Sequence, residues 1–219
     1  MTGTWDWAAA GDAVPPLLRA LVTTLLAGVA GFGLAAVLGL PLALARDARH
    51  RAIRLPVIAA VEFVRGTPLL IQVYVLYFTL PTLGIVLPAL LTGVGALGLH
   101  YATYVSEVYR TGLRSVGRGQ RDAAAALGLR PGTAFRHVVL PQALPPILPA
   151  LGNYALAILK ETPILASISV TEMLQRAKLI GAETFRYTEP ITLAGLAFLV
   201  VSLAGATGLR ALEWRFKYP

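Results

Sequence analysis

Polar side chains within long uncharged stretches are the residues of this chain that could do chemistry. A polar group that faces lipid is costly, so such groups turn toward a bundle interior or a water-filled path. Tyrosine faces can hold a cation, and an amide or basic group can hold a carboxylate. The candidates for lining such a pathway are Gln72, Tyr74, His100, Tyr101, Tyr104, Asn153, Tyr154, Lys160 and Glu161.

These candidates also have structural explanations that the sequence leaves open. Tyr101 and Tyr104 are three residues apart and would share one helix face. Each tyrosine could equally serve helix packing or an aromatic belt at the membrane surface. Lys160 and Glu161 are adjacent, so an ion pair at the membrane surface explains them as well as contact with a solute does.

Catalytic chemistry has little support in the sequence. The three histidines, His50, His100 and His137, are scattered, and neither His-Glu-x-x-His nor Gly-x-Ser-x-Gly occurs. Cysteine is absent, which excludes a cysteine nucleophile and thiolate metal sites. The phosphate-cradling sequence Gly-x-x-x-x-Gly-Lys-Ser/Thr is absent too. We therefore expect a non-catalytic chain that binds no metal and does not itself bind ATP.

The composition predicts an all-α membrane protein. Hydrophobic residues make up 56% of the 219 residues and charged residues 14%, with a mean hydropathy of +0.68. Soluble domains carry about 25% charged residues, so this chain could not solvate a globular surface. The length allows about five crossings of roughly 20 residues each. We expect one membrane domain over residues 17–213, after a short periplasmic N-terminus (1–16) and before a cytoplasmic tail (214–219).

Uncharged runs place the crossings. Residues 20–45, 137–159 and 190–209 are each long enough to cross once, whereas the uncharged run 66–106 is twice as long. A turn near residues 81–84, where proline and glycine interrupt the helix, divides that longer run. The five spans predicted on this basis are residues 20–45, 66–82, 86–106, 140–160 and 190–210.

The positive charges orient these spans. In a five-span chain, segments 46–54, 110–136 and 210–219 fall on one side and hold 13 of the 19 lysines and arginines. The positive-inside rule makes that side cytoplasmic, with the N-terminus outside and the C-terminus inside. The net charge of +8 then needs no nucleic-acid partner. Glu62 and Arg65, three residues apart before the second span, share a helix face and can pair.

The loop over residues 109–141 is too long for a simple connector. Residues 120–127 favour a helix, and Gly128 follows as a C-terminal cap. Pro131 can open a second short helix, and we expect Pro141 to close it where the fourth span begins. The loop is therefore predicted to form a compact helical elbow between the third and fourth spans.

The spacing within this elbow resembles a known pattern. Asp122-Ala123-Ala124, three residues, Gly128, nine residues, then Val138-Val139-Leu140-Pro141 resembles the EAA loop of ABC importer permeases, Glu-Ala-Ala-x3-Gly-x9-Ile-x-Leu-Pro. Asp122 and Val138 depart from it conservatively. Residues 63–70 (FVRGTPLL) and 160–163 (KETP) resemble segments of the polar amino-acid subgroup. Within it, residues 100–102, 106–110 and 150–154 are most similar to ectoine and hydroxyectoine permeases.

The resemblance implies a fold, a function and partners. The fold is the ABC transmembrane type-1 permease fold, with the elbow as a coupling helix in the bacterial inner membrane. Partners would be a cytoplasmic ATPase dimer that carries ATP and Mg²⁺, a second permease subunit, identical or paralogous, and a periplasmic or lipid-anchored solute-binding protein. The solute would be a polar amino acid or a related zwitterionic compatible solute. The residues expected to couple to the ATPase are Asp122, Ala123, Ala124, Gly128, Val138, Leu140 and Pro141.

Two other functions stay open on the sequence. An ion-coupled secondary transporter would show inverted repeats or a buried ion relay, and the sequence suggests neither. A structural subunit of another membrane complex would need no pathway at all.

Overall fold

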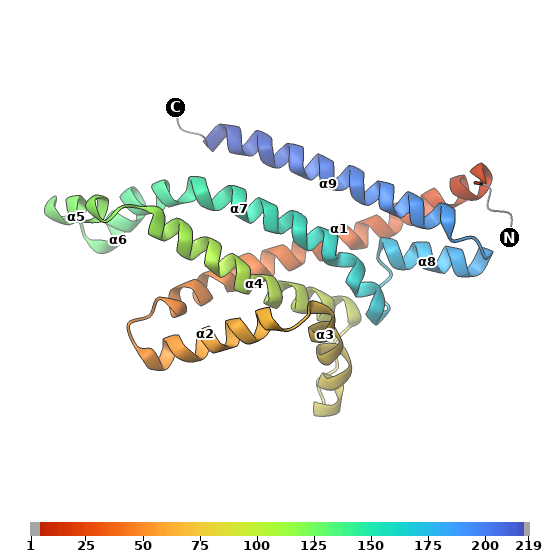
Figure 1. The fold of residues 1–219 in the computed structure, drawn as a ribbon, viewed down its shortest axis with the longest axis horizontal. Coiled ribbons are helices and arrows are strands. Elements are labelled where there is room, and N and C mark those ends of the chain that lie inside the picture. Colours follow the sequence, from red (N-terminus) through yellow and green to blue (C-terminus); the bar gives the residue numbers. More distant parts are fainter. Residues whose placement is uncertain (1–4, 217–219) are drawn as a thin grey trace.

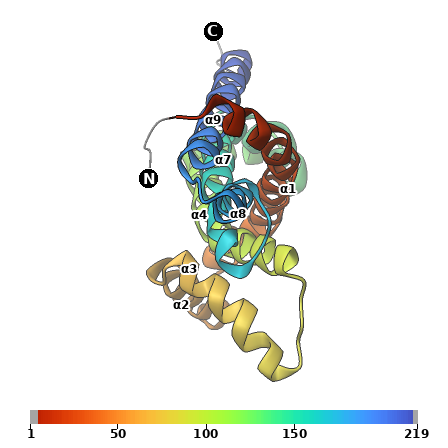
Figure 2. The same cartoon turned by 90° about the vertical axis from the view of Figure 1, so that its right-hand side faces the viewer.

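The computed structural model describes residues 5–216, and within them every regular element is helical, which confirms the all-α class (Figure 1). Four long helices run lengthwise through the molecule: α1 (Trp7–Arg46), α4 (Ala89–Ser115), α7 (Leu140–Glu161) and α9 (Thr188–Phe216). The shorter elements are α2 (Arg51–Gly66), α3 (Leu69–Tyr74), α5 (Arg118–Ala126), α6 (Pro131–Ala134) and α8 (Met173–Thr184). Figure 2 shows α2 and α3 set to one side of the long helices.

Among the described residues, three helical segments are long and apolar enough to cross a membrane: Trp7–Arg46, Pro131–Ile168 and Thr188–Ala211. They contain the predicted spans 20–45, 140–160 and 190–210. The bent pair Arg51–Gly66 and Leu69–Leu83 makes a fourth if it counts as one span. Helix α4, which holds most of predicted span 86–106, is not among them, because histidine, tyrosine, threonine and serine lower its mean hydropathy. The five-span count stays a prediction.

The predicted second span, residues 66–82, is not one straight helix. It comprises the short helix α3, a π-helical turn (Val75–Thr79) and a 3₁₀ turn (Leu80–Leu83), set at 104° to α2. The bend occurs where Pro68 forces Thr67 into an extended conformation, with φ −108° and ψ 133°. The chain then reverses at Gly84, whose φ of +81° suits glycine, within the predicted turn.

The N-terminal boundary also differs from the prediction. Helix α1 begins at Trp7, so most of the region expected as a periplasmic terminus is helical. Asp6 caps it by accepting hydrogen bonds from the backbone N–H groups of Ala8 and Ala9 at 2.9 and 3.2 Å. Residues 1–4, and residues 217–219 of the predicted tail, lie outside the described residues.

Small residues let the long helices approach closely. A Cβ placed on Gly39 of α1 would lie 2.7 Å from Val105 Cγ1 of α4, and one on Gly205 of α9 would lie 2.6 Å from Leu156 Cδ2 of α7. Apolar helices in lipid gain no hydrophobic energy by associating, so close van der Waals packing of this kind holds them together. Meanwhile large apolar side chains remain exposed along α9, namely Leu196, Leu199, Val200 and Leu203, as expected for a lipid-facing surface.

Helix α7 matches the predicted fourth span, but the helix does not begin there. Pro141 does not close the elbow's second helix, because α6 continues through a π-helical turn, η3 (Phe135–Val139), directly into α7. The π-turn lies directly before Pro141, where the ring of a proline would otherwise crowd the preceding turn of a helix. The result is one helical segment from Pro131 to Ile168 that joins the elbow to the bundle.

At the opposite end, Glu172 caps α8 from a buried position. Its carboxylate accepts hydrogen bonds from the N–H groups of Leu174 and Gln175 at 3.0 and 2.6 Å, and its side chain is fully buried. Burial raises the pKa of Glu172, although the two backbone hydrogen bonds act in the opposite direction. Nearby, the N–H of Met173 donates to Thr24 Oγ1 at 3.0 Å, which ties α8 to α1.

Candidate functional site

Helices α4 and α7 bring four aromatic side chains together in the bundle. His100, Tyr101 and Tyr104 lie on α4, and Tyr154 faces them from α7. The ring centroids of Tyr101 and Tyr104 are 5.9 Å apart, which confirms that they share a face, and Tyr154 lies 6.1 and 5.9 Å from them. His100 contacts Tyr101 and Tyr104 at 5.5 and 5.4 Å. We call these four residues the aromatic cluster.

Gln72 connects the aromatic cluster to the bend between α2 and α3. Its Nε2 donates to the carbonyl oxygens of Val64 and Thr67 at 2.6 and 2.9 Å, and its Oε1 lies 3.2 Å from His100 Nδ1. Because Oε1 can only accept, this contact assigns the proton to Nδ1 of His100. Gln72 thus fixes both the backbone at the bend and the orientation of the imidazole.

Arg65 belongs to the same site, and the sequence analysis did not place it there. Its guanidinium donates to the backbone oxygen and Oγ1 of Thr103, and its Cζ lies 4.7 Å from the ring centroid of Tyr104. The pair with Glu62 that the sequence allowed does not form within the described residues. A cation in the middle of an apolar bundle needs carbonyl and aromatic partners, and α4 supplies both. The sequence offered one indication of this role: Arg65 lies three residues before Pro68, where the helix breaks.

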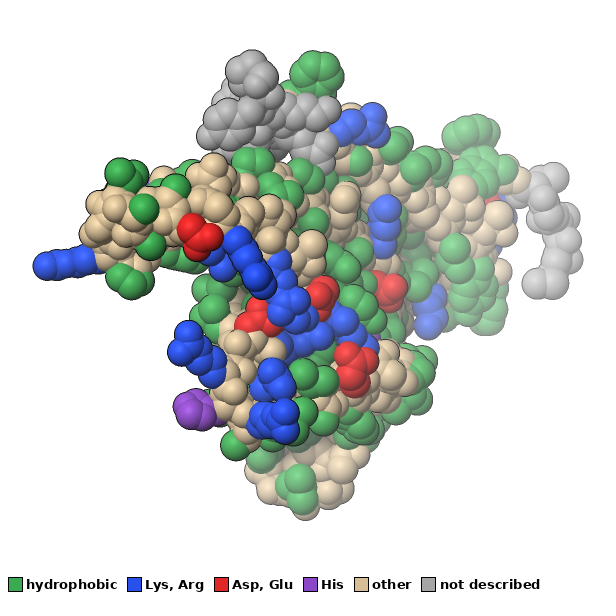
Figure 3. Space-filling view, turned by 60° about the vertical axis from the view of Figure 1, so that its left-hand side comes forward, with side chains coloured by type: hydrophobic (Ala, Val, Ile, Leu, Met, Phe, Trp, Pro, Cys, Tyr) green, Lys and Arg blue, Asp and Glu red, His purple; other side chains and the backbone are tan. Residues whose placement is uncertain are grey.

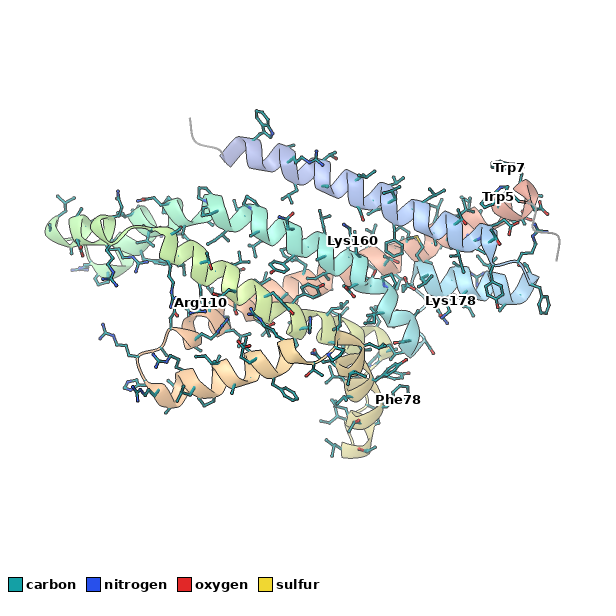
Figure 4. All side chains as sticks on the ribbon, in the orientation of Figure 1. Trp5, Trp7, Phe78, Arg110, Lys160 and Lys178 are labelled. Atoms are coloured by element: carbon teal, nitrogen blue, oxygen red, sulfur yellow. The ribbon has the colours of Figure 1, made fainter. Side chains whose placement is uncertain are left out.

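In the part of the chain that the structure describes, the other four pathway candidates make no ring contact with this cluster, although Glu161 lies near enough to Tyr101 for its charge to act on that side chain. Tyr74 packs against Phe78, with ring centroids 5.7 Å apart, on the segment bent away from α2. Asn153, Lys160 and Glu161 are exposed on α7, where Figure 4 labels Lys160. Within the described residues, Lys160 and Glu161 form no ion pair with each other, so the interfacial pair that the sequence allowed is absent there.

A cavity of about 260 Å³ opens beside the aromatic cluster, between α4 and α7. Tyr104 and Tyr154 line it at one end, and it continues along Glu107, Thr111 and Ser115 toward the end of α4. Aromatic faces therefore border one part of the cavity, and a carboxylate and hydroxyl groups border the rest. Such mixed walls can contact both the polar and the apolar parts of a small solute.

The predicted elbow is present and projects from one end of the molecule (Figure 1). Helix α5 ends in a Schellman motif: the N–H of Leu129 donates to Ala124 O at 3.1 Å, and the N–H of Gly128 donates to Ala125 O at 2.9 Å. Gly128 has a φ of +70° and open space around its Cα. The predicted cap is thus confirmed, although α5 starts two residues earlier and ends one residue earlier than expected.

The coupling candidates are divided between the elbow's surface and its base. Asp122 and Ala123 are exposed, whereas Ala124 is buried beneath them. Val138, Leu140 and Pro141 lie where the π-turn passes into α7. An apolar groove of about 420 Å³ separates α5 from this base, lined by Leu113, Arg121, Ala125, Leu129, Pro131, Ala134, Phe135 and Val139. An exposed elbow with an open apolar groove suits docking of a partner.

Ion pairs lock the end of α1 to the end of α4, next to the elbow. Arg46 and Arg110 each donate to Glu107 Oε2 at 2.8 Å, and Asp47 Oδ1 accepts from Arg110 and Arg114 at 3.0 and 2.7 Å. Figure 3 shows basic side chains gathered at this end, and Figure 4 labels Arg110 there. The same end of the molecule holds the end of α1, the start of α2, the elbow and the end of α9 (Figure 1).

Comparison with known proteins gives consistent results. The family described as the binding-protein-dependent transport system inner membrane component matches residues 35–218. A probable amino-acid ABC transporter permease of Sinorhizobium fredii is 44% identical, over 97% of this chain and 92% of that protein. The arginine transport system permease ArtQ of Bacillus subtilis is 35% identical, over 97% of each chain.

Solved structures support the same assignment. A chain from the crystal structure of an amino acid ABC transporter with histidines superposes with a TM-score of 0.90 at 33% identity, covering 97% of this chain and 99% of that one. A chain of the methionine transporter MetNI, at 17% identity and a TM-score of 0.72, shares the fold. This chain therefore belongs to the binding-protein-dependent transport system inner membrane component family, and it is a multi-pass inner-membrane permease subunit of an amino-acid ABC importer.

Proposed function

We propose that this permease conducts a polar amino acid or a related zwitterionic solute past the aromatic cluster, with ectoine and hydroxyectoine among the candidates. The printed names of the relatives, which include arginine and glutamine permeases, support the amino-acid class. The tyrosine faces would hold the solute's cationic group. Arg65, whose guanidinium lies over Tyr104, adds a positive group that can hold a carboxylate.

The observation that carries the proposal is the connection between the elbow and the cluster. The elbow joins α4 to α7, and these are the two helices that carry the aromatic cluster. A displacement of the elbow is therefore transmitted to both helices and would move the aromatic cluster relative to the rest of the bundle. Such a rigid-body movement is the simplest way to open the pathway first to one side and then to the other.

We infer that the elbow is the coupling site for a separate cytoplasmic ATPase dimer. Its surface residues Asp122 and Ala123 and its cap at Gly128 would contact the ATPase, while ATP and Mg²⁺ remain on that partner. A second permease subunit, identical or paralogous, would complete the pathway, and a periplasmic or lipid-anchored binding protein would deliver the solute. This arrangement puts the elbow and C-terminus in the cytoplasm and the N-terminus outside, as the clustered arginines favour.

The test is uptake into vesicles that contain this permease, its ATPase and its binding protein. The variant Gly128→Asp is compared with Gly132→Asp, because both glycines are exposed in the elbow with open space around them, and only Gly128 has a positive φ. We expect Gly128→Asp to insert normally and to lose ATP-driven uptake, while Gly132→Asp retains most of it. Normal uptake by Gly128→Asp would place the coupling site elsewhere, and uptake driven by an ion gradient without ATP would indicate a secondary transporter.

A further inference from the structure

A cavity with two arginines opens at the end of the molecule opposite the elbow, where α8 lies beside α1 (Figure 1). Its volume is about 330 Å³. The cavity is lined by Pro16, Arg19, Ala20, Thr23, Thr171 and Arg176. Two guanidinium groups and two threonine hydroxyls therefore border one space. These residues belong neither to the aromatic cluster nor to the elbow, so the cavity is a site of its own.

The cavity has an excess of positive charge. Within the described residues, Arg19 forms no ion pair, and Arg176 is paired only loosely, with 3.8 Å between its Nη1 and Glu183 Oε1. The carboxylate of Glu172, next to Thr171 in the chain, is buried and already accepts two backbone N–H groups of α8. An anion in the cavity would therefore meet guanidinium groups that have little competition from carboxylates.

Buried contacts fix the two helices that carry these arginines. The N–H of Met173 donates to Thr24 Oγ1 at 3.0 Å, and both residues are buried. Met173 and Ala177 of α8 also pack into one core cluster with Ala13 and Leu17 of α1. The backbone positions from which the two guanidinium groups extend are therefore set by packing, as a binding site requires.

The length of α1 indicates the depth of the cavity in the membrane. Arg19 and Arg46 bound the uncharged run of residues 20–45, and they are separated by about 40 Å along the helix. At the average tilt of about 20°, this corresponds to about 38 Å across the bilayer. The hydrocarbon core is about 30 Å thick, so each arginine lies about 4 Å beyond it when the run is centred. That level is inside the polar headgroup layer, which is about 5–8 Å deep on each side.

An exposed apolar stripe continues from Arg19 toward the middle of the bilayer. Val22, Leu26 and Val29 follow Arg19 on one side of α1, and they are 56%, 59% and 71% exposed. A soluble protein that docks from outside could reach Arg19 but not this stripe, which lies at the depth of the hydrocarbon. A phospholipid would contact both, with its phosphate at the arginines and an acyl chain along the stripe.

We propose that the cavity lined by Arg19 and Arg176 binds the phosphate group of an anionic phospholipid, from the leaflet at the N-terminal end of α1. Guanidinium groups match phosphate oxygens with paired, charge-assisted hydrogen bonds. Bound there, the lipid bridges α1 and α8 and holds these two helices together at this end of the bundle. Only the identification of this leaflet as the periplasmic one rests on the proposed function.

The experiment measures lipid binding to the full-length purified chain in mixed micelles by native mass spectrometry. The probes are phosphatidylglycerol and phosphatidylcholine with identical acyl chains. The variant R19Q/R176Q is compared with R130Q/R136Q, which removes the same charge from exposed elbow positions outside the cavity. Each arginine near an anionic lipid contributes about fivefold to binding. We expect R19Q/R176Q to bind phosphatidylglycerol at least about tenfold more weakly and R130Q/R136Q less than about twofold more weakly.

Further variants test the arginines themselves. R19K/R176K keeps the charge and should retain most of the binding. If the double glutamine variant does not purify as a monodisperse chain, R19Q and R176Q are measured singly, each with an expected loss of about threefold or more. Equal losses in both double glutamine variants, or no preference for phosphatidylglycerol over phosphatidylcholine, would overturn the proposal.

Three outcomes would assign the cavity to another ligand and thereby overturn the proposal. Displacement of the lipid by millimolar inorganic phosphate would indicate a site for the free ion. Equal binding of glycerophosphoglycerol, the same head group without acyl chains, would show that the apolar stripe plays no part. Unchanged lipid binding by R19Q/R176Q, together with weaker binding of the purified solute-binding protein, would indicate a protein interface. The assay needs no transport, so its failure and a failure of the proposed transport function are distinguishable.

Discussion

Replacing Gly128 by alanine tests whether the elbow depends on one backbone conformation. Gly128 adopts a φ of +70°, and a Cβ added there would meet no atom within 4 Å. The only cost is therefore that of the left-handed conformation, roughly 1–2 kcal/mol for an L-residue. At about 1 kcal/mol, the capped end of α5 should open about five times more often.

Gly119→Ala is the matched control. Gly119 is also exposed with open space around it, but it lies inside α5 with ordinary helical geometry. Alanine there should stabilise the helix by roughly 0.5–1 kcal/mol. Gly128→Asn is a second comparison, because asparagine adopts the left-handed conformation more readily than alanine.

The assay is amide hydrogen exchange of the full chain, followed at Leu127 and Leu129, whose N–H groups bond to Ala123 and Ala124 at the end of α5. Exchange at these amides should rise about fivefold in Gly128→Ala, rise less in Gly128→Asn, and slow in Gly119→Ala. Equal exchange in Gly128→Ala and the parent chain, or similar acceleration by Gly119→Ala, would refute the argument that the backbone conformation of Gly128 maintains the elbow.

Three more predictions concern the ion pairs, the buried carboxylate and the cluster. Glu107→Gln should lower the free energy of unfolding by roughly 1–2 kcal/mol, seen as a lower apparent melting temperature in detergent, because it leaves the buried Arg46 without its carboxylate partner. Glu62→Gln is the control and should change the melting temperature little. Burial raises the pKa of Glu172, so its stabilising effect is present at low pH and is lost as pH rises through the raised pKa; Glu172→Gln should flatten this decline in a melting series across pH, and parallel curves would contradict it. Tyr104→Leu should raise the solute concentration for half-maximal uptake several-fold, whereas Tyr74→Leu, outside the cluster, should not; equal effects would argue against the cluster as the pathway.

Local chemistry explains which parts of the site were predictable. The spacing of Tyr101 and Tyr104 and the cap at Gly128 depend only on helix geometry and glycine's backbone freedom, and both were confirmed. The contact between Tyr154 and the α4 tyrosines joins residues about fifty positions apart, and no short-range pattern encodes it. The structure added Arg65 to the site, because its partners lie on α4 and not on its own helix.

Prolines account both for the wrong helix end at Pro141 and for the bend that the sequence analysis did not place in the second span. A proline is read as the end of a helix because it lacks an N–H and its ring crowds the preceding turn. At Pro68 the rule applied, and the predicted span proved to be bent just after its start. At Pro141 the π-turn made room for the ring, so the helix continued. Whether a neighbouring turn can widen depends on the surrounding packing, which the sequence does not display.

The unbroken segment from Pro131 to Ile168 has a mechanical consequence. At 1.5 Å per residue it is about 57 Å long, well beyond the roughly 30 Å of hydrocarbon it would cross. A segment of this length can pivot within the bilayer, so that a push on its elbow end would swing its other end in the opposite direction. The π-turn at Phe135–Val139 lies between the elbow and α7, and a stiffer helix there would change how much of each movement reaches the other end of α7.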